Sequence, residues 1–276
     1  MKYELTPPYS SACTAGKPVL NAYPTPIGPE NSSAKRPAVI ICGGGAYNHI
    51  SYRESHPVAL RFQSYGMSAF TLDYSVDGKP FPTALTELAE AVAFVKENAA
   101  EWNTDPEKVI VCGFSAGAHL AASLAVHHSS DFMREMFGER DIRPFGQILC
   151  YPVITGGKYT HKGSLESIAG ASPSEETIKL VSCEENVSEA TPPCFLWHCA
   201  DDATVPVMNS ILYMNALAEA NVPFEAHIFP KGGHGIALCD DTALKEDDPR
   251  YLNETAAQWF PLALDWVRRL CSVKYR

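Results

Sequence analysis

A serine between two glycines is the first pattern in this sequence that could do chemistry. It reads Gly113-Phe114-Ser115-Ala116-Gly117, and it follows an apolar, β-branched run and enters an alanine-rich segment. A sharp strand-to-helix turn holds such a serine in a strained backbone conformation and leaves room only for small neighbours. The helix also directs its positive N-terminal end toward the serine. The pattern therefore predicts that Ser115 is a nucleophile and that the amide of Ala116 receives its oxyanion.

A second glycine cluster follows an earlier apolar run. Its residues are Cys42-Gly43-Gly44-Gly45-Ala46-Tyr47. Glycines let a backbone approach a reacting carbonyl closely, and a loop in this place supplies the second amide of an oxyanion hole. Gly45 and Ala46 are both candidates for that donor. The alternative is a phosphate-binding loop, but neither a G-K-[ST] ending nor the full G-x-G-x-x-G spacing is present.

A carboxylate and a histidine occur later, in the chain order that this chemistry requires. Asp201 and Asp202 follow a strand pattern, where a carboxylate can orient an imidazole. Their side chains leave the backbone in different directions, so only one is expected to serve. His234 lies in a glycine-flanked loop, residues 230–235, from which it can reach across to Ser115. The order serine, aspartate, histidine predicts a catalytic triad.

The elements that must position these residues alternate between strand and helix patterns. Strand patterns cover 38–42, 67–74, 109–112, 147–151, 194–198 and 224–229, and helix patterns cover 57–65, 84–98, 116–127, 207–220 and 253–270. The first forty residues predict a short edge hairpin with loops, and 105–107 predict a turn. The alternation predicts an α/β fold in one domain, residues 1–276, with a mostly parallel central sheet and helices on both faces.

One long segment, residues 153–191, interrupts the alternation. It shows loops and a single helical pattern near 175–181. A long insertion between two strands of a compact domain is more often functional than accidental. We therefore expect a small cap over the site. Candidates for the walls of a substrate pocket are Tyr47, Tyr151 and, from the cap, His161.

Composition narrows the class of partner. The 22 Lys and Arg against 32 Asp and Glu give a net charge of −10, which argues against a nucleic-acid surface. No stretch is long and apolar enough to span a membrane, and the start lacks the apolar core of a signal peptide. The nine cysteines are an odd number and several lie in strand patterns, which favours reduced thiols and a cytoplasmic location. No metal-site motif occurs, so neither a metal nor a cofactor is expected.

Together these segments resemble the α/β-hydrolase esterases related to acetylxylan esterases and the BD-FAE group. The residues that carry the resemblance are 41–47, 51–54, 57–59, 72–76, 113–120, 197–202 and 233–235. The similarity extends from about Val19 to the C-terminal helix. It implies an α/β-hydrolase fold, and it implies Asp202 as the acid, because in such enzymes the acid lies three residues before the Val of a Val-Pro pair. Arg53 and Glu54 are candidates for an ion pair, either fixing the loop near the oxyanion hole or simply exposed.

We therefore expect a serine carboxylic-ester hydrolase that works through an acyl-enzyme on a small-molecule ester. The resemblance implies acetylated sugars, xylo-oligosaccharides or other small acyl esters. One alternative is a serine peptidase of the prolyl-oligopeptidase type, but those carry a large propeller domain for which 276 residues leave no room. Another is a non-catalytic binding protein with this fold, against which the intact Ser115, Asp202 and His234 speak.

Overall fold

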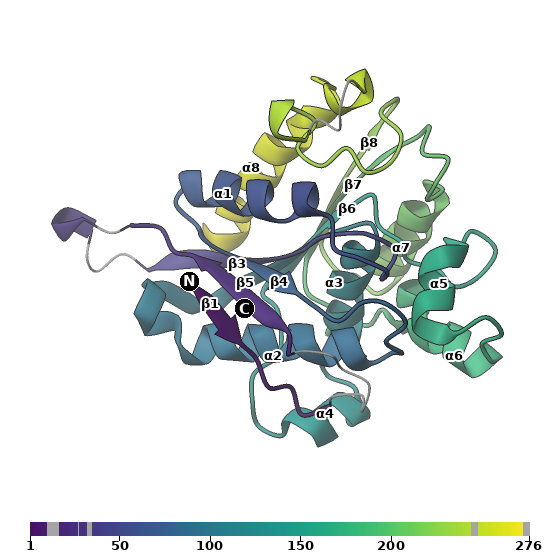
Figure 1. Cartoon of the computed structure of the whole chain (residues 1–276), viewed down its shortest axis with the longest axis horizontal. Coiled ribbons are helices and arrows are strands. Elements are labelled where there is room, and N and C mark those ends of the chain that lie inside the picture. The colour runs from purple at the N-terminus through teal and green to yellow at the C-terminus, as the bar shows by residue number, and fades with distance from the viewer. Residues whose placement is uncertain (10–16, 27, 32–34, 244–247, 273–276) are drawn as a thin grey trace.

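The computed structural model of the chain describes residues 1–9, 17–26, 28–31, 35–243 and 248–272 (Figure 1). The strands in these residues are β1 (Lys2–Glu4), β2 (Val19–Tyr23), β3 (Arg36–Cys42), β4 (Ser68–Asp73), β5 (Thr104–Phe114), β6 (Gly146–Cys150), β7 (Cys194–Cys199) and β8 (Phe224–Phe229). They form one sheet in the order β1-β2-β4-β3-β5-β6-β7-β8. Strand β2 is antiparallel to both β1 and β4, and the pairs from β4 through β8 are parallel. This confirms the predicted edge hairpin and the mostly parallel sheet.

Helices cover both faces of the sheet. The α-helices are α1 (His56–Ser64), α2 (Thr83–Glu97), α3 (Ala116–His127), α4 (Asp131–Phe137), α5 (Lys162–Ala169), α6 (Glu175–Val181), α7 (Met208–Glu219) and α8 (Trp259–Ser272). Short 3₁₀ turns are η1 (Pro29–Asn31), η2 (Tyr52–Glu54), η3 (Ala99–Trp102), η4 (Cys183–Asn186), η5 (Asp241–Ala243), η6 (Pro249–Tyr251) and η7 (Ala256–Gln258). Figure 1 shows α1 and α8 on one side of the sheet and α2 on the other.

The alternation of side chains along β3 explains the two layers. Val39 and Ile41 point into a core that includes residues of α1 and α8, whereas Ile40 and Cys42 point into a second core with α2 and α3. Successive side chains of a strand face opposite sides of the sheet, so a strand covered on both sides is apolar throughout. This is why residues 38–42 form a continuous apolar run.

The structure corrects two predicted boundaries. Residues 105–107 were expected to form a turn, but they lie within β5, and only a local bond from the Glu107 amide to Asp105 Oδ1 at 3.1 Å has turn character. The closing helix was expected from residue 253, but α8 begins at Trp259. The Asn253 side chain accepts from the amide of Ala256 at 3.0 Å and so holds the chain in a different turn before the helix.

The segment 153–191 contains α5, α6 and η4. Helix α6 matches the predicted pattern near 175–181, whereas α5, like α4, was not predicted. Helices α5 and α6 lie side by side (Figure 1). Helix α5 also contacts the loops after β3 and β4, because the Ser167 hydroxyl bonds Asn48 at 3.1 Å and the amide of Phe81 donates to Ile168 O at 2.9 Å.

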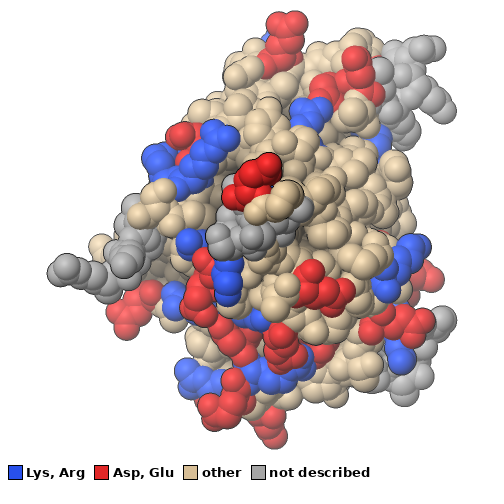
Figure 2. Space-filling model, turned by 90° about the vertical axis from the view of Figure 1, so that its left-hand side faces the viewer, with Lys and Arg blue, Asp and Glu red and all other residues tan. Residues whose placement is uncertain are grey.

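The distribution of charge on the surface and the state of the cysteines can be compared with the expectations from composition. On the face shown in Figure 2, basic side chains lie beside acidic ones instead of forming one basic area. Eight of the nine cysteines lie in the described part of the chain and are free, whereas Cys13 lies outside it. A separate search of the described helices finds none with the length and apolar character needed to cross a membrane.

Candidate active site

Ser115 occupies the turn between β5 and α3. Its φ of 53° lies in a region that side-chain-bearing residues rarely adopt, and its amide donates to Cys150 O at 3.0 Å. Helix α3 begins against the end of β3, so a Cβ at Gly117 would lie only 2.1 Å from Cys42 O. Glycine at 117 is therefore required for the close approach that fixes this turn.

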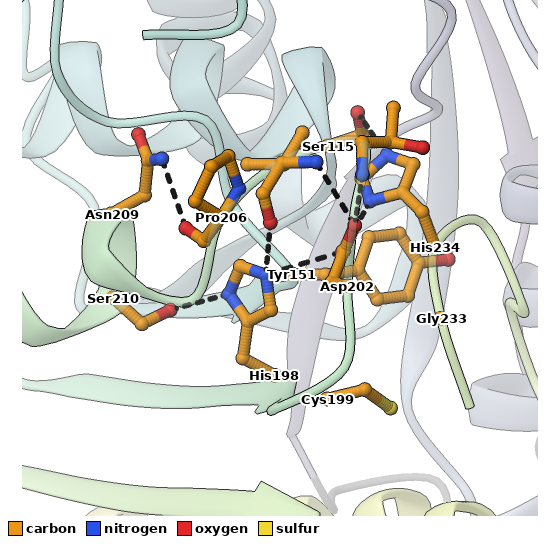
Figure 3. Close-up of polar contacts among 12 residues, drawn as sticks. Ser115, Tyr151, His198, Cys199, Asp202, Pro206, Asn209, Ser210, Gly233 and His234 are labelled. Atoms are coloured by element: carbon orange, nitrogen blue, oxygen red, sulfur yellow. Dashed lines mark hydrogen bonds and ion pairs between the residues drawn. The ribbon is translucent and has the colours of Figure 1, made fainter. Parts of the chain in front are cut away.

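Three side chains form a hydrogen-bonded line at the carboxyl ends of parallel strands (Figure 3). His234 Nε2 lies 2.8 Å from Ser115 Oγ, and His234 Nδ1 lies 2.6 Å from Asp202 Oδ2. Ser115 follows β5, Asp202 follows β7 and His234 follows β8. Ser115 and Asp202 are buried, whereas the His234 side chain remains 15% exposed. In this arrangement the imidazole can take the serine proton while the carboxylate orients the ring.

The two adjacent aspartates have separate partners. Asp201 Oδ1 accepts from the amides of Gly232 and Gly233 at 3.0 and 2.9 Å, and Asp202 alone reaches the imidazole of His234. Asp201 therefore holds the backbone of the loop that carries His234.

Four donors surround the carboxylate of Asp202. Oδ1 accepts from the amides of Thr204 and Val205, each at 2.9 Å, and Oδ2 accepts from His234 and faces His198 Nε2 at 3.2 Å. Burial alone would raise the pKa of Asp202. The hydrogen bonds, with that from His198 the largest, lower the pKa by more than burial raises it, so the net pKa lies below the ordinary value. Asp202 is therefore ionised at neutral pH.

Backbone amides beside Ser115 are available for an oxyanion. Ala116 is the first residue of α3, where an amide has no carbonyl partner within the helix. Gly45 and Ala46 have positive φ values of 129° and 55°, and neither amide donates to a protein acceptor among the described residues. The amide of Gly44, in contrast, donates to Glu54 Oε2 at 3.0 Å. The amides of Gly45 and Ala46 are therefore not used within the described part of the protein, and their role as oxyanion donors stays a prediction.

The expected ion pair between Arg53 and Glu54 is wrong. Arg53 donates to Gly235 O at 3.2 Å and to Ala243 O at 3.1 Å, on the loop that carries the histidine. Glu54 is buried, and its second oxygen accepts from the Tyr151 hydroxyl at 2.7 Å. Buried polar groups need partners: Glu54 accepts from an amide and a hydroxyl, and Arg53 donates to two carbonyls, so the two side chains do not neutralise each other.

Tyr151 is fully buried beneath His234. Its hydroxyl donates to Glu54 and accepts from the amide of Ala237 at 2.9 Å, and its ring meets the His234 ring edge-on at 4.9 Å. Burial raises the pKa of Tyr151 well above its usual value, so the hydroxyl keeps its proton. The residue connects the loop after β3 to the histidine loop.

Tyr47 is also buried. Its hydroxyl lies 2.8 Å from His119 Nδ1, and His119 Nε2 lies 2.7 Å from Val181 O at the end of α6. Burial lowers the pKa of His119 to about 4, so the ring is neutral, donates from Nε2 and accepts from Tyr47. Tyr47 lines a cavity with Phe81 and Leu120.

His161 lies at the start of α5 and near the triad. Its Nδ1 accepts from the amide of Ser164 at 3.3 Å. Burial, and then the neighbouring His234, lower the pKa of His161, while Asp202 acts in the opposite direction. The ring is therefore neutral with its proton on Nε2, for which no protein partner is found among the described residues.

Two contacts of the site involve partners that the sequence does not specify. One is the acceptor role of Glu54, and the other is the contact of His198 with Asp202. The only sequence signal for the second is a histidine four residues before the acid at the end of a strand. Among the described residues, no group of three or more His, Cys, Asp or Glu side chains is placed to hold a metal ion.

Comparison with solved structures defines the class. The acetyl ester-xyloside bifunctional hydrolase from Caldicellulosiruptor lactoaceticus matches with a TM-score of 0.83 and 32% identity, over 98% of this chain and 97% of that one. The carboxylesterase Cest-2923 from Lactobacillus plantarum WCFS1 matches with a TM-score of 0.86 and 27% identity, over 100% and 99%. The chain thus has the α/β-hydrolase fold, as predicted.

The family follows from the sequence comparison. The BD-FAE model matches residues 27–217, and the chain belongs to the BD-FAE family. Endo-1,4-beta-xylanase B of Butyrivibrio fibrisolvens is 40% identical over 76% of this chain and 34% of its own length. The chain spans 34–51% of the length of the first curated relatives that it matches. The predicted family is confirmed.

Proposed function

We propose that this chain is a serine carboxylic-ester hydrolase whose catalytic triad is Ser115, His234 and Asp202. The observation that carries the proposal is the unbroken line from the serine hydroxyl through the imidazole to the carboxylate, at 2.8 and 2.6 Å. The strained φ of Ser115 and the free amides beside it support the same reaction.

In the first half-reaction, the Ser115 hydroxyl gives its proton to His234 Nε2 while Oγ bonds to the ester carbonyl carbon. The carbonyl oxygen becomes an oxyanion and accepts hydrogen bonds from Ala116 and from Gly45 or Ala46. The bond to the alcohol then breaks, and the alcohol leaves with the proton from His234. Water repeats these steps on the acyl-enzyme and releases the acid. Asp202 stabilises the imidazolium throughout.

The segment 153–191 packs directly behind the nucleophile. The amides of His119 and Val153 donate to Ser115 O, and both residues line a small cavity. Thr160 and Ser164 of the 153–191 segment complete its wall. We therefore assign this segment as the cap. Similarity to a relative named acetylxylan esterase favours short acyl chains such as acetyl.

The alcohol part is assigned to a sugar. One matched relative, from Xylanibacter ruminicola, is named acetylxylan esterase and is 28% identical over 76% of this chain and 42% of its own length. The free Nε2–H of His161 offers a donor to a sugar hydroxyl from the cap. The substrate class is therefore acetylated sugars or xylo-oligosaccharides. The free cysteines of the described residues, all buried except Cys271, support a cytoplasmic location.

The test of the reaction is Ser115→Ala, compared with wild type on 4-nitrophenyl acetate. We expect turnover to fall by about 10⁴-fold or more, with an unchanged unfolding transition. A fluorophosphonate probe should label wild type and not the variant. A folded variant that keeps its turnover would reject the triad. Absence of labelling in wild type would favour a non-catalytic binding protein.

The test of the substrate is a panel of esters under one set of conditions. It contains acetylated xylo-oligosaccharides, acetylated monosaccharides, nitrophenyl esters of increasing chain length, methyl ferulate and a peptide nitroanilide. We expect the highest kcat/KM on acetylated sugars and a steep decline beyond short acyl chains. A flat ester profile would contradict the sugar assignment, and preference for the nitroanilide would favour a peptidase.

A further inference from the structure

A second histidine contacts the acid of the triad from inside the protein. His198 lies in β7 and is fully buried. Its Nε2 is 3.2 Å from Asp202 Oδ2, the same oxygen that accepts from His234 Nδ1 at 2.6 Å (Figure 3). Asp202 therefore lies between two imidazoles, one facing the serine and one facing the core.

The partners of His198 define where its proton lies. Nε2 is also 2.9 Å from Val205 O, and both neighbours of Nε2 are acceptors, so this nitrogen must carry hydrogen. Nδ1 is 2.8 Å from Ser210 Oγ, and this hydroxyl can donate to it. A neutral ring therefore donates its single Nε2–H to Val205 O and holds the same N–H 3.2 Å from Asp202 Oδ2.

This contact affects the acid in two ways. The amides of Thr204 and Val205 hold Oδ1, and His198 holds Oδ2 from the side opposite to solvent access, so the carboxylate cannot rotate freely. The N–H of His198 also takes up part of the negative charge on Oδ2. A carboxylate with less available charge stabilises an imidazolium less strongly.

Few ionisable groups surround the pair formed by His198 and Asp202. His234 lies on the other side of Asp202, and the cap residue His161 and the thiol of Cys199 each interact with Asp202 over a longer range. The remaining direct partners of His198, Val205 O and Ser210 Oγ, are neutral. Removal of the His198 donor therefore acts on Asp202 directly and through Val205, whose carbonyl loses its partner and whose amide holds Asp202 Oδ1.

We propose that His198 is a positioning residue whose Nε2–H holds Asp202 from the core side and shares the charge that this carboxylate presents to His234. The proposal rests on the proposed function. His198 does not touch the reacting atoms, and it acts only through the acid.

The experiment compares His198→Phe, which has no donor, with His198→Gln, whose amide N–H can replace Nε2–H. For His198→Phe we expect kcat on 4-nitrophenyl acetate to fall about 10-fold to 100-fold, with KM within about twofold of wild type. The acidic limb of kcat/KM should move to higher pH by about 0.5–1 pH unit, because an unshared Asp202 stabilises protonated His234 more strongly. His198→Gln should recover most of both effects.

Two controls separate positioning from simple loss of packing. His127→Phe removes another buried histidine, whose Nε2 contacts Leu180 O far from the triad, and should change stability without moving the pH profile. Ser210→Ala keeps the imidazole and removes only the hydroxyl at Nδ1, so it should fold and give a smaller shift in the same direction.

A direct titration of His234 by NMR gives a readout that does not require turnover. The pKa of His234 should be higher in His198→Phe than in wild type. Loss of kcat without any shift, a shift to lower pH, or an unchanged profile in both His198→Phe and Ser210→Ala would overturn the proposal. If Ser115→Ala instead keeps its activity, the proposed function fails, and the NMR titration still tests the contact.

Discussion

Asp201 and Asp202 are consecutive residues that hold the histidine loop at two different points. Asp201 binds the amides of Gly232 and Gly233, and Asp202 binds the ring of His234. One carboxylate thus positions the backbone and the other orients the side chain.

The pair offers a matched comparison, Asp202→Asn against Asp201→Asn. In Asp202→Asn we expect kcat to fall about 10⁴-fold, because an amide neither stabilises imidazolium nor enforces the right tautomer. In Asp201→Asn the side-chain oxygen can still accept both amide bonds, so we expect a loss of less than about tenfold. Steady-state kinetics with circular dichroism as a folding control measures both. A larger loss in Asp201→Asn would exchange the two roles.

Glu54→Gln tests the support of the oxyanion loop. Glutamine has one acceptor oxygen, so it cannot accept from both Gly44 N and Tyr151 Oη as the carboxylate does. We expect kcat to fall about 10-fold to 100-fold with little change in KM, since the loop loses its position beside Ser115. Tyr151→Phe is the companion variant and should lose about 1–3 kcal/mol of unfolding free energy, because Ala237 N is left without its partner. Unchanged kinetics in Glu54→Gln would exclude this supporting role.

His161→Ala tests the assignment of the alcohol subsite. We expect KM for acetylated xylo-oligosaccharides to rise about 10-fold, the value of one lost hydrogen bond, while kcat/KM on 4-nitrophenyl acetate changes less than about twofold. Lys162→Ala, at the next and exposed position, is the control and should leave both substrates unaffected. Equal losses on the two substrates would argue against a sugar contact.

His119 gives a prediction on pH and stability. Burial lowers its pKa from 6.5 to about 4, so the folded protein binds fewer protons than the unfolded chain in this range. The contribution of neutral His119 to the free energy of unfolding is fully present above pH 6.5. It is lost as the pH falls toward about 4, and the loss is on the order of 3 kcal/mol. His119→Gln, which does not titrate here, should show a flatter dependence in urea unfolding from pH 7.5 to 4. If the stability of His119→Gln fell with pH as steeply as that of wild type, the lowered pKa of His119 would be contradicted.

Gly117→Ala tests the close approach of α3 to β3. The new Cβ would meet Cys42 O and Gly43 O at 2.1 and 2.5 Å, both backbone atoms that cannot move aside cheaply. We expect a loss of at least about 3 kcal/mol of unfolding free energy, and an inactive site. Gly163→Ala is the matched control, since its Cβ would meet only His161 Cε1 at 3.5 Å, and should change stability by less than about 1 kcal/mol.

Local patterns were sufficient for the sheet and for most helices. The continuous run at 38–42 and the helical spacing at 84–98 are recovered as β3 and α2 within one or two residues. Helix α5 was missed because its N-cap is the histidine ring of His161, not a residue typical of caps, and because Gly163 follows it. The sequence predicts a strand only over 109–112, because Pro106 indicates a turn before it. Pairing with β3 extends β5 back to Thr104, past this proline.

The site was predictable where chain order and local turns define it. Ser115 and His234 lie in glycine-rich turns after strands, and such turns can be recognised from the sequence alone. The partners of Glu54 could not be predicted from the sequence, because Tyr151 is 97 residues away and only packing brings the two together. The contact of His198 with Asp202 depends on side-chain direction at a strand end, which periodicity does not define.

The bridges from Glu54 to Tyr151 and from Arg53 to Gly235 have a consequence for motion. They join two surface loops, residues 43–54 and 230–243, which would otherwise open independently. Segments joined in this way unfold locally as one cooperative unit. Native-state hydrogen exchange should therefore give the amides of Gly44 and Ala237 the same opening free energy, and the machinery for proton transfer and the oxyanion pocket should be lost together.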